Sequence, residues 1–200
     1  MFIRIFLFFV WFSLSGVVYA DNPMLPSAER LVNAASGQVG KTTIYDPAYV
    51  GLSYPMGDIS RKRGVCTDVI IRAFRDAFAV DLQKLVHEDM KRNFSAYPKI
   101  WGLKRTDRNI DHRRVPNLRA YFKRAGASLQ VTDDPRDFKP GDLVSQTVGG
   151  NLPHIVIVSN QMSADGSRPL VIHNIGAGTQ IEDSLFKFPI TGHYRFKLNR

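Results

Sequence analysis

The sequence predicts an α+β fold in a single domain, with N-terminal helices packed on a C-terminal antiparallel sheet. Apolar residues recur with helical spacing up to about residue 124, and short β-branched or aromatic runs follow from residue 143. Helices that precede a run of strands favour this segregated layout over an alternating parallel sheet. The length of 200 residues suits one domain.

Residues 1–20 are typical of a secretory signal peptide. Arg4 supplies a positive charge, residues 5–12 are an unbroken apolar run, and Val18 and Ala20 are small residues at a cleavage site. We therefore divide the chain into a signal peptide (1–20) and a domain (21–200), and expect a periplasmic or secreted protein without stable membrane insertion. The alternative is an uncleaved anchor, although a spanning helix needs ~20 apolar residues.

Helices are expected over residues 27–40, 66–78, 82–90 and 117–124. The clearest begins at Cys66, because its apolar residues return every three or four positions while charged residues occupy the other face. Gly64 is expected to provide the backbone freedom for a sharp turn into this helix. Gly126 is expected to end the last one.

Strands are expected over residues 143–147, 154–159, 170–173 and 193–197, separated by Gly, Pro, Asn and Asp. If the second and third strands pair across the turn at 160–169, His154 and His173 approach each other. One histidine can then accept a proton, while the other, or Asn174, fixes its tautomer.

Cys66 is the only cysteine, which excludes an internal disulfide and a multi-cysteine metal site. It is a buried small hydrophobe, a dimerising thiol or a nucleophile. Its position at a helix start, close after Arg61, Lys62 and Arg63, predicts a lowered thiol pKa and backbone N–H groups ready to hold an oxyanion.

Other readings of these residues remain open. A lone cysteine on an amphipathic helix is often part of the core, and histidines at strand ends are often surface residues. His154, His173 and His193 are enough to ligate zinc, but no helical histidine pair and no acidic partner motif accompany them, so we expect no metal and no cofactor. The oligomeric state does not follow from the sequence.

The charge balance is basic, with 27 Lys and Arg against 18 Asp and Glu and a net charge of +9. Export argues against nucleic acid as the partner of this surface. An anionic polymer of the cell envelope is the expected partner instead.

Several sequence blocks resemble those of NlpC-type papain-like cell-wall cysteine peptidases: GVCTDV, PGDLV, HIVIV and VIHN. Over residues 28–197 the chain resembles an uncharacterised bacterial exported family within that superfamily, on the further blocks YDPAY, YPMGD, IDHRRVPN and IHNIGAG. The resemblance implies a compact α+β cysteine hydrolase that cleaves a stem-peptide or amidase-type amide bond in peptidoglycan. It assigns Cys66 as nucleophile, His154 as base and His173 as the residue that orients the base.

The resemblance also suggests substrate-binding residues. Tyr54 lies where the peptidases often carry a substrate-facing tyrosine, and Asp68 and Asn174 are further candidates. Arg113 and Arg114 are expected either to pair with stem-peptide carboxylates or to form structural salt bridges.

The motif around the cysteine departs from the peptidases, which usually carry Asp before it and Ser-Gly after it. Here those positions hold Val65, Thr67 and Asp68, so γ-glutamyl endopeptidase specificity does not carry over. The alternative function is a non-catalytic cell-wall-binding or inhibitor module on the same fold.

Overall fold

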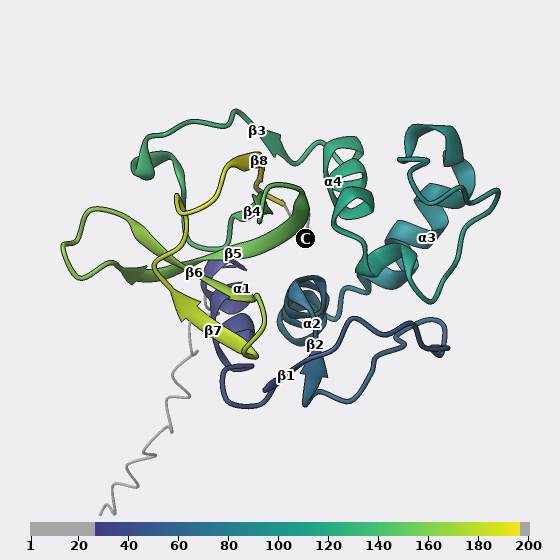
Figure 1. Cartoon of the computed structure of the whole chain (residues 1–200), viewed down its shortest axis with the longest axis horizontal. Helices are drawn as coiled ribbons and strands as arrows, with labels where there is room; N and C mark the ends of the chain where they lie inside the picture. Colours follow the sequence, from purple (N-terminus) through teal and green to yellow (C-terminus); the bar gives the residue numbers. More distant parts are fainter. Residues whose placement is uncertain (1–26, 197–200) are drawn as a thin grey trace, which may run out of the picture.

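The structure is a computed structural model that describes residues 27–196, and its architecture is α+β (Figure 1). Four α-helices come mostly before the strands: α1 (Ser27–Ser36), α2 (Cys66–Phe78), α3 (Leu82–Arg92) and α4 (Val115–Arg124). Six strands form an antiparallel sheet in the order β3-β8-β4-β5-β6-β7: β3 (Ser128–Leu129), β4 (Leu143–Val148), β5 (Leu152–Met162), β6 (Pro169–Asn174), β7 (Thr179–Glu182) and β8 (Ile190–Tyr194).

The four predicted helices are confirmed, with small shifts at their ends. The first ends at Ser36 rather than near Gly40, because a series of turns follows it. The fourth begins at Val115, since Pro116 fits the first helical turn, where its missing N–H is not needed. α2 ends at Phe78, and the capping residue Ala79 has a φ of 57°, the left-handed conformation typical of helix ends.

Three of the predicted strands are confirmed as β4, β5 and β6, and the pairing of β5 with β6 is confirmed with them. The last strand was misplaced: β8 covers Ile190–Tyr194 instead of residues 193–197. β7 was not predicted, because its sequence TQIE has a single apolar residue and no alternating pattern. β3 has only two residues and was also missed.

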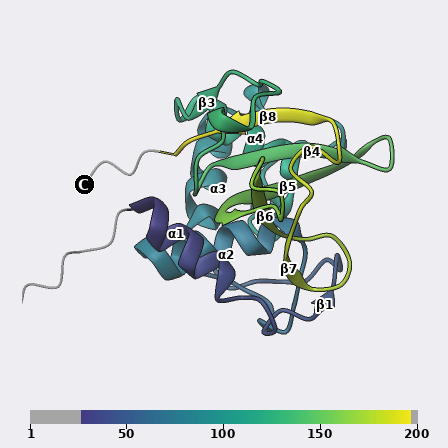
Figure 2. The ribbon, with the colours of Figure 1, turned by 90° about the vertical axis from the view of Figure 1, so that its left-hand side faces the viewer.

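The sheet has an apolar cluster on each face. Ile155 and Ile157 of β5 pack with α1, α2 and α4 on one face, where α1 and α2 lie side by side (Figure 2). Val156 and Val158 point to the opposite face and join a smaller cluster with Phe138 and Leu185. Burying each such side chain contributes about 1.5–3 kcal/mol to the free energy of unfolding. Because β5 supplies side chains to both clusters, it is the central strand of the core.

Two short strands, β1 (Ile44–Tyr45) and β2 (Arg63–Gly64), form a separate parallel pair just before α2. The prediction that Gly64 supplies unusual backbone freedom is wrong, since it is not among the residues with positive φ. Space is tight there instead: a Cβ would lie 3.1 Å from Asp68 Cβ and 3.1 Å from Arg72 Nη1, so these side chains would have to shift to admit one.

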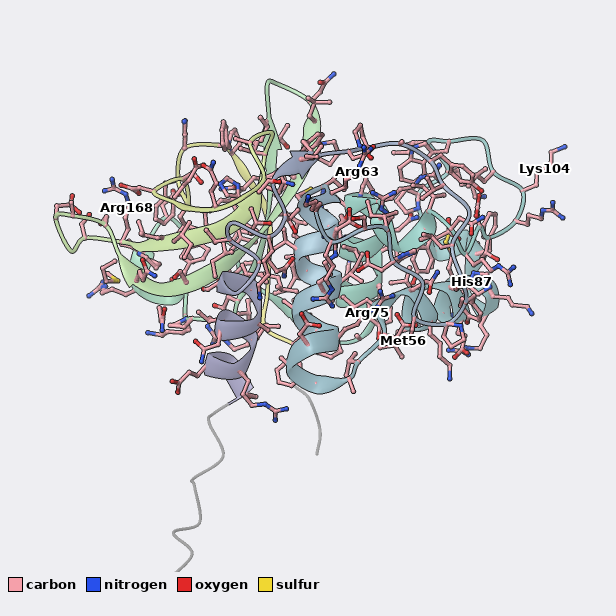
Figure 3. All side chains as sticks on the ribbon, turned by 90° about the horizontal axis from the view of Figure 1, so that it is seen from below. Met56, Arg63, Arg75, His87, Lys104 and Arg168 are labelled. Carbon is pink, nitrogen blue, oxygen red and sulfur yellow. The ribbon has the colours of Figure 1, made fainter. Side chains whose placement is uncertain are left out.

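Basic side chains are spread over the molecule. Arg168 on the β5–β6 side and Lys104 in the loop before α4 extend from opposite ends (Figure 3). No helix within residues 27–196 is long and apolar enough to cross a membrane. The predicted signal peptide lies outside the described residues.

Candidate active site around Cys66

Cys66 is the first residue of α2, and hydrogen bonds hold the backbone in front of it. The Asp68 carboxylate accepts from the N–H of Val65 at 2.7 Å, which satisfies an amide at the helix start. The Asn174 side chain donates to the carbonyl of Gly64 at 2.9 Å. The end of β6 is thereby tied to the chain that leads into the cysteine.

The sheet opens where α2 begins. β5 and β6 pair at Ile157–Ile172 and Val158–Val171. The start of β5 and the end of β6 are not paired with each other, which leaves an opening between the two strands. The free N–H of Ile155 is directed at the Cys66 sulfur in this opening. Asn174 reaches the same helix start from the other strand, so the opening between β5 and β6 receives the thiol.

The electrostatics of the thiol differ from the prediction. Burial raises the pKa of Cys66 to about 11, whereas the sequence predicts a lowered value. Backbone amides of Ile155, Thr67 and Cys66 itself act in the lowering direction, but they do not offset the loss of water. The negative charge of Asp68 adds to the rise. The resting thiol is therefore protonated at neutral pH.

The basic residues before Cys66 do not reverse this effect, because acidic partners hold two of them. Arg61 donates to Asp76 at 2.6 Å and Arg63 donates to Asp46 at 2.9 Å. Both arginines are exposed at the surface. Their charges are compensated and screened by water.

The two predicted histidines meet. Nε2 of His154 lies 2.8 Å from Nδ1 of His173, and both side chains are buried. No hydrogen bond within residues 27–196 joins either ring to the Cys66 thiol. His154 nevertheless stands directly before Ile155, whose amide reaches the sulfur, and its Nδ1 is not engaged by His173.

Glu182 of β7 extends this pair. Its Oε2 lies 2.8 Å from Nε2 of His173, and its side chain is 40% exposed. Burial lowers the pKa of His154 to about 3, with a smaller lowering by His173. Burial also lowers the pKa of His173, while Glu182 acts in the raising direction. Both imidazoles are consequently neutral at pH 7.

Asp68 and Arg113, two predicted substrate-binding residues, bind each other. Nε and Nη2 of Arg113 each donate to Asp68 at 3.0 Å, and both side chains are buried. Arg113 also donates to the carbonyls of Ala48 and Asp46, which fixes the loop after β1. Of the two roles expected for Arg113, the structure supports the structural salt bridge.

A cavity of about 290 Å³ opens beside the thiol. Its wall is rich in aromatic, proline and aliphatic side chains, and the part built from residues 27–196 contains no carboxylate: Tyr45, Pro47, Val65, Cys66, Ile100, Trp101, Ile110, Arg113, Arg114, Val115, Pro116 and Pro153. Such a wall suits a neutral or anionic ligand with apolar parts. Ile100 is 69% exposed at this site, as expected of a residue available for contact.

Arg114 is the second cation of this wall. Its guanidinium carbon lies 4.1 Å from the centroid of the Trp101 ring, a cation–π contact. Its Nη1 is buried and has no hydrogen-bond partner among residues 27–196. Unlike Arg113, Arg114 forms no ion pair with a carboxylate of residues 27–196, although Asp111 lies near enough to interact with its charge, so its guanidinium is available beside the cysteine cavity.

Tyr54, the predicted substrate-facing tyrosine, does not line this cavity. Its ring packs edge-on against His87 at a centroid distance of 5.2 Å and lies under Arg108. Tyr45 lines the cavity instead, and partial burial together with the nearby Cys66 raises the pKa of its hydroxyl. Asn174 is fully buried and its amide oxygen accepts from Gly176, so both ends of its side chain are used within the fold.

His193 is separate from the other two histidines. Its Nε2 lies 2.8 Å from Asp142, which also pairs with Arg195 at 2.7 Å. The three histidines considered as zinc ligands therefore do not converge. Within residues 27–196 no group of three His, Cys, Asp or Glu side chains is arranged to hold a metal ion.

Sequence reasoning missed three residues of the site. Tyr45 belongs to the YDPAY block, whose residues have no role that the sequence predicts. Trp101 lies in an irregular segment without periodicity, and Glu182 lies in a strand that was not predicted. A rule that searches hairpin partners of a candidate histidine for carboxylates would have found Glu182, because β6 and β7 are joined by a short turn.

The comparisons with known proteins identify a family. Residues 32–196 match the family described as "Domain of unknown function (DUF1287)". The chain is 54% identical over 166 residues to "Uncharacterized protein YijF" of Escherichia coli (strain K12). This match covers 83% of the chain and 80% of its relative.

Proposed function

We propose that this chain, which belongs to the DUF1287 family, is an exported thiol hydrolase that cleaves an amide bond in peptidoglycan. The observation that carries the proposal is the hydrogen-bonded series His154–His173–Glu182 next to the strand opening that receives Cys66. Nucleophilic catalysis by a thiol requires a base and a group that orients it. Cell-wall specificity and export rest on the sequence resemblance and on residues 1–20.

The proposed reaction begins with a neutral thiol. The sulfur of Cys66 attacks the carbonyl carbon of the amide while its proton passes to Nδ1 of His154. The backbone N–H groups of Cys66 and Thr67, which are directed at the sulfur, donate to the oxyanion that forms there. Because the resting pair is uncharged, proton transfer and attack occur together.

The second half of the reaction reverses the proton transfer. The His154 imidazolium gives its proton to the nitrogen of the scissile bond, the C–N bond breaks, and an amine leaves. Water then attacks the thioester carbonyl and transfers one proton to His154, and that proton returns to the departing sulfur. The products are a free carboxylic acid, an amine and the original thiol.

The cavity supports a peptidic substrate with a free carboxylate. Its apolar and aromatic wall fits the aliphatic parts of a stem peptide, and Arg114 is positioned to pair with an acidic group. A larger cavity of about 930 Å³ shares Pro116 with it and carries Arg119 and Lys123. Positive charge next to the cysteine cavity favours an anionic wall fragment.

We also propose a papain-like, NlpC-type fold for residues 27–196. Three features support it: the cysteine starts a helix, that helix packs on an antiparallel sheet, and the two histidines lie on adjacent strands. Their order along the chain, Cys66, His154 and His173, agrees with that superfamily as described above.

Two observations favour the alternative, a non-catalytic wall-binding or inhibitor module. The pKa of the Cys66 thiol is raised rather than lowered, and no hydrogen bond within residues 27–196 joins it to His154. Such a module uses the cavity and its cations for affinity and does not need the thiol. In that case Cys66→Ala still binds peptidoglycan, and neither wild type nor the variant releases fragments from it.

The test compares cleavage by matched variants. Purified protein, Cys66→Ala, His154→Ala and the control His87→Ala are incubated with peptidoglycan, and released fragments are identified by mass spectrometry. His87 is a half-buried histidine outside the site (Figure 3). We expect fragments from wild type and His87→Ala only. The proposal is lost if all four proteins release the same fragments or if none does.

A further inference from the structure

Glu182 lies at the end of a continuous hydrogen-bond series that sequence reasoning did not anticipate. On the β6–β7 hairpin, His173 is registered opposite Gln180 and Val171 opposite Glu182. The contact from Glu182 Oε2 to His173 Nε2, 2.8 Å long, is therefore a diagonal cross-strand pair. The second contact, from His173 Nδ1 to His154 Nε2, is also 2.8 Å long.

The chemistry of the acceptor determines where the protons lie. An ionised carboxylate only accepts hydrogen bonds, so Nε2 of His173 must carry a proton toward Glu182. A neutral imidazole carries one N–H, which leaves Nδ1 of His173 as an acceptor. Nε2 of His154 must then donate to it, and Nδ1 of His154 is left without a proton.

We propose that Glu182 is a positioning residue that selects the tautomers of both histidines and leaves Nδ1 of His154 as the free base. Its catalytic consequence rests on the proposed function, whereas the tautomers can be observed without any substrate. Glu182 does not contact the reacting atoms and acts through His173.

One competing arrangement gives the opposite result. If His173 is doubly protonated and forms an ion pair with Glu182, its Nδ1–H donates to Nε2 of His154. His154 then carries its own proton on Nδ1 and cannot accept one there. The charged groups around His173 are Glu182 and Lys187, of opposite sign. The tautomer of His154 distinguishes the two arrangements directly.

The experiment is a long-range ¹H–¹⁵N correlation spectrum of the purified protein with labelled histidine. The chain has five histidines, and His154→Gln and His173→Gln assign the two relevant rings. We expect a proton on Nε2 and none on Nδ1 in both rings of the wild type near pH 7.5. A proton on Nδ1 of His154, or a doubly protonated His173, overturns the proposal.

Substitution of Glu182 tests its causal role. Glu182→Ala removes the acceptor and Glu182→Gln supplies an amide that can donate or accept, so both should give mixed tautomers in His154. The matched control is Glu88→Gln, a half-buried carboxylate on α3 whose side chain is 39% accessible, close to the value for Glu182. Unchanged tautomers in both Glu182 variants overturn the proposal. If the variants unfold, the wild-type spectrum alone decides.

Activity provides a separate readout. Where wild type cleaves peptidoglycan, Glu182→Ala should lower kcat by about 10–100-fold, by analogy with the loss found when the partner that orients a metal-bound histidine is removed, and leave KM unchanged. If the tautomers are as expected but Cys66→Ala cleaves like wild type, the proposed function fails and the role of Glu182 in the histidine pair stands.

Discussion

The side-chain amide of Asn174 donates a 2.9 Å hydrogen bond to the carbonyl of Gly64. This contact joins the residue that follows His173 to the residue two positions before Cys66. It spans 110 positions of the sequence. The histidine strand and the cysteine helix are thereby held in one relative position.

Asn174→Ala should destabilise the protein by about 0.5–1.5 kcal/mol, because it removes one of the two donors to the buried carbonyl of Gly64, the N–H of Asp46 being the other, and takes the side-chain acceptor from the N–H of Gly176. Asn174→Asp should be at least as damaging, since a carboxylate offers no donor. Urea unfolding measures the loss. Gln130→Ala, at an exposed position, is the control and should unfold at the wild-type midpoint. Wild-type stability in Asn174→Ala would contradict this role.

The Asp68–Arg113 pair should respond as a buried ion pair. Asp68→Asn leaves the buried guanidinium of Arg113 without a counter-charge, and Arg113→Met does the same to the carboxylate of Asp68. Each change should lower the free energy of unfolding by about 3–5 kcal/mol. We expect the double variant Asp68→Asn/Arg113→Met to lose less than the sum of the single variants. Chemical denaturation of all four proteins gives the coupling. Additive losses would show that the two residues act independently.

Alkylation should report the raised pKa of Cys66. Burial raises the pKa of the thiol above its ordinary value, to about 11. The reactive thiolate therefore forms only at high pH. The rate of iodoacetamide incorporation should therefore keep rising from pH 6 to pH 10 without a plateau. Mass spectrometry follows the reaction, and Cys66→Ala shows no incorporation. A plateau below pH 8 would mean that the helix start lowers the pKa after all.

If the proposed function holds, Arg114 should discriminate between wall peptides that carry a free carboxylate and those that lack one. Arg114→Ala is expected to lower kcat/KM by about 10–100-fold for wall peptides with a free carboxylate, as the loss of one charged hydrogen bond predicts. Amidated peptides should be cleaved at the wild-type rate. Arg114→Lys should recover little, because lysine lacks the planar group that stacks on Trp101. The control is Lys104→Ala, an exposed cation (Figure 3); equal losses for both peptide classes would refute the assignment.

Gly178 should tolerate no side chain. Its φ is +85°, and a Cβ would collide with the backbone of Thr42 and Thr43, where the N–H of Thr179 bonds to Thr42. Gly178→Ala should cost at least about 1–3 kcal/mol and displace β7, which carries Glu182. Gly51→Ala is the matched control, because nothing lies within 4 Å of its Cβ position. Thermal unfolding compares the two; equal midpoints would be the contrary result.

Much of the architecture follows from local pattern. The 3.6-residue spacing of Val69, Ile70, Ala73 and Phe74 predicts α2 and places Cys66 at its start. The pairing of β5 with β6, inferred from two apolar runs and the turn between them, brings His154 to His173 as predicted. Glu182 could not be found in this way, because β7 lacks an alternating pattern and its contact is diagonal across a hairpin.

By itself, the sequence determined the helices, the central strands, the single thiol at a helix start and the meeting of two histidines. Periodicity and turn residues are local properties, and they were sufficient for these features. The tertiary structure alone decided that Arg113 is bound by Asp68, that Arg114 is unpaired and that Glu182 ends the histidine series. It also reversed the expected pKa of Cys66, because loss of water on burial outweighs the backbone amides at the helix start.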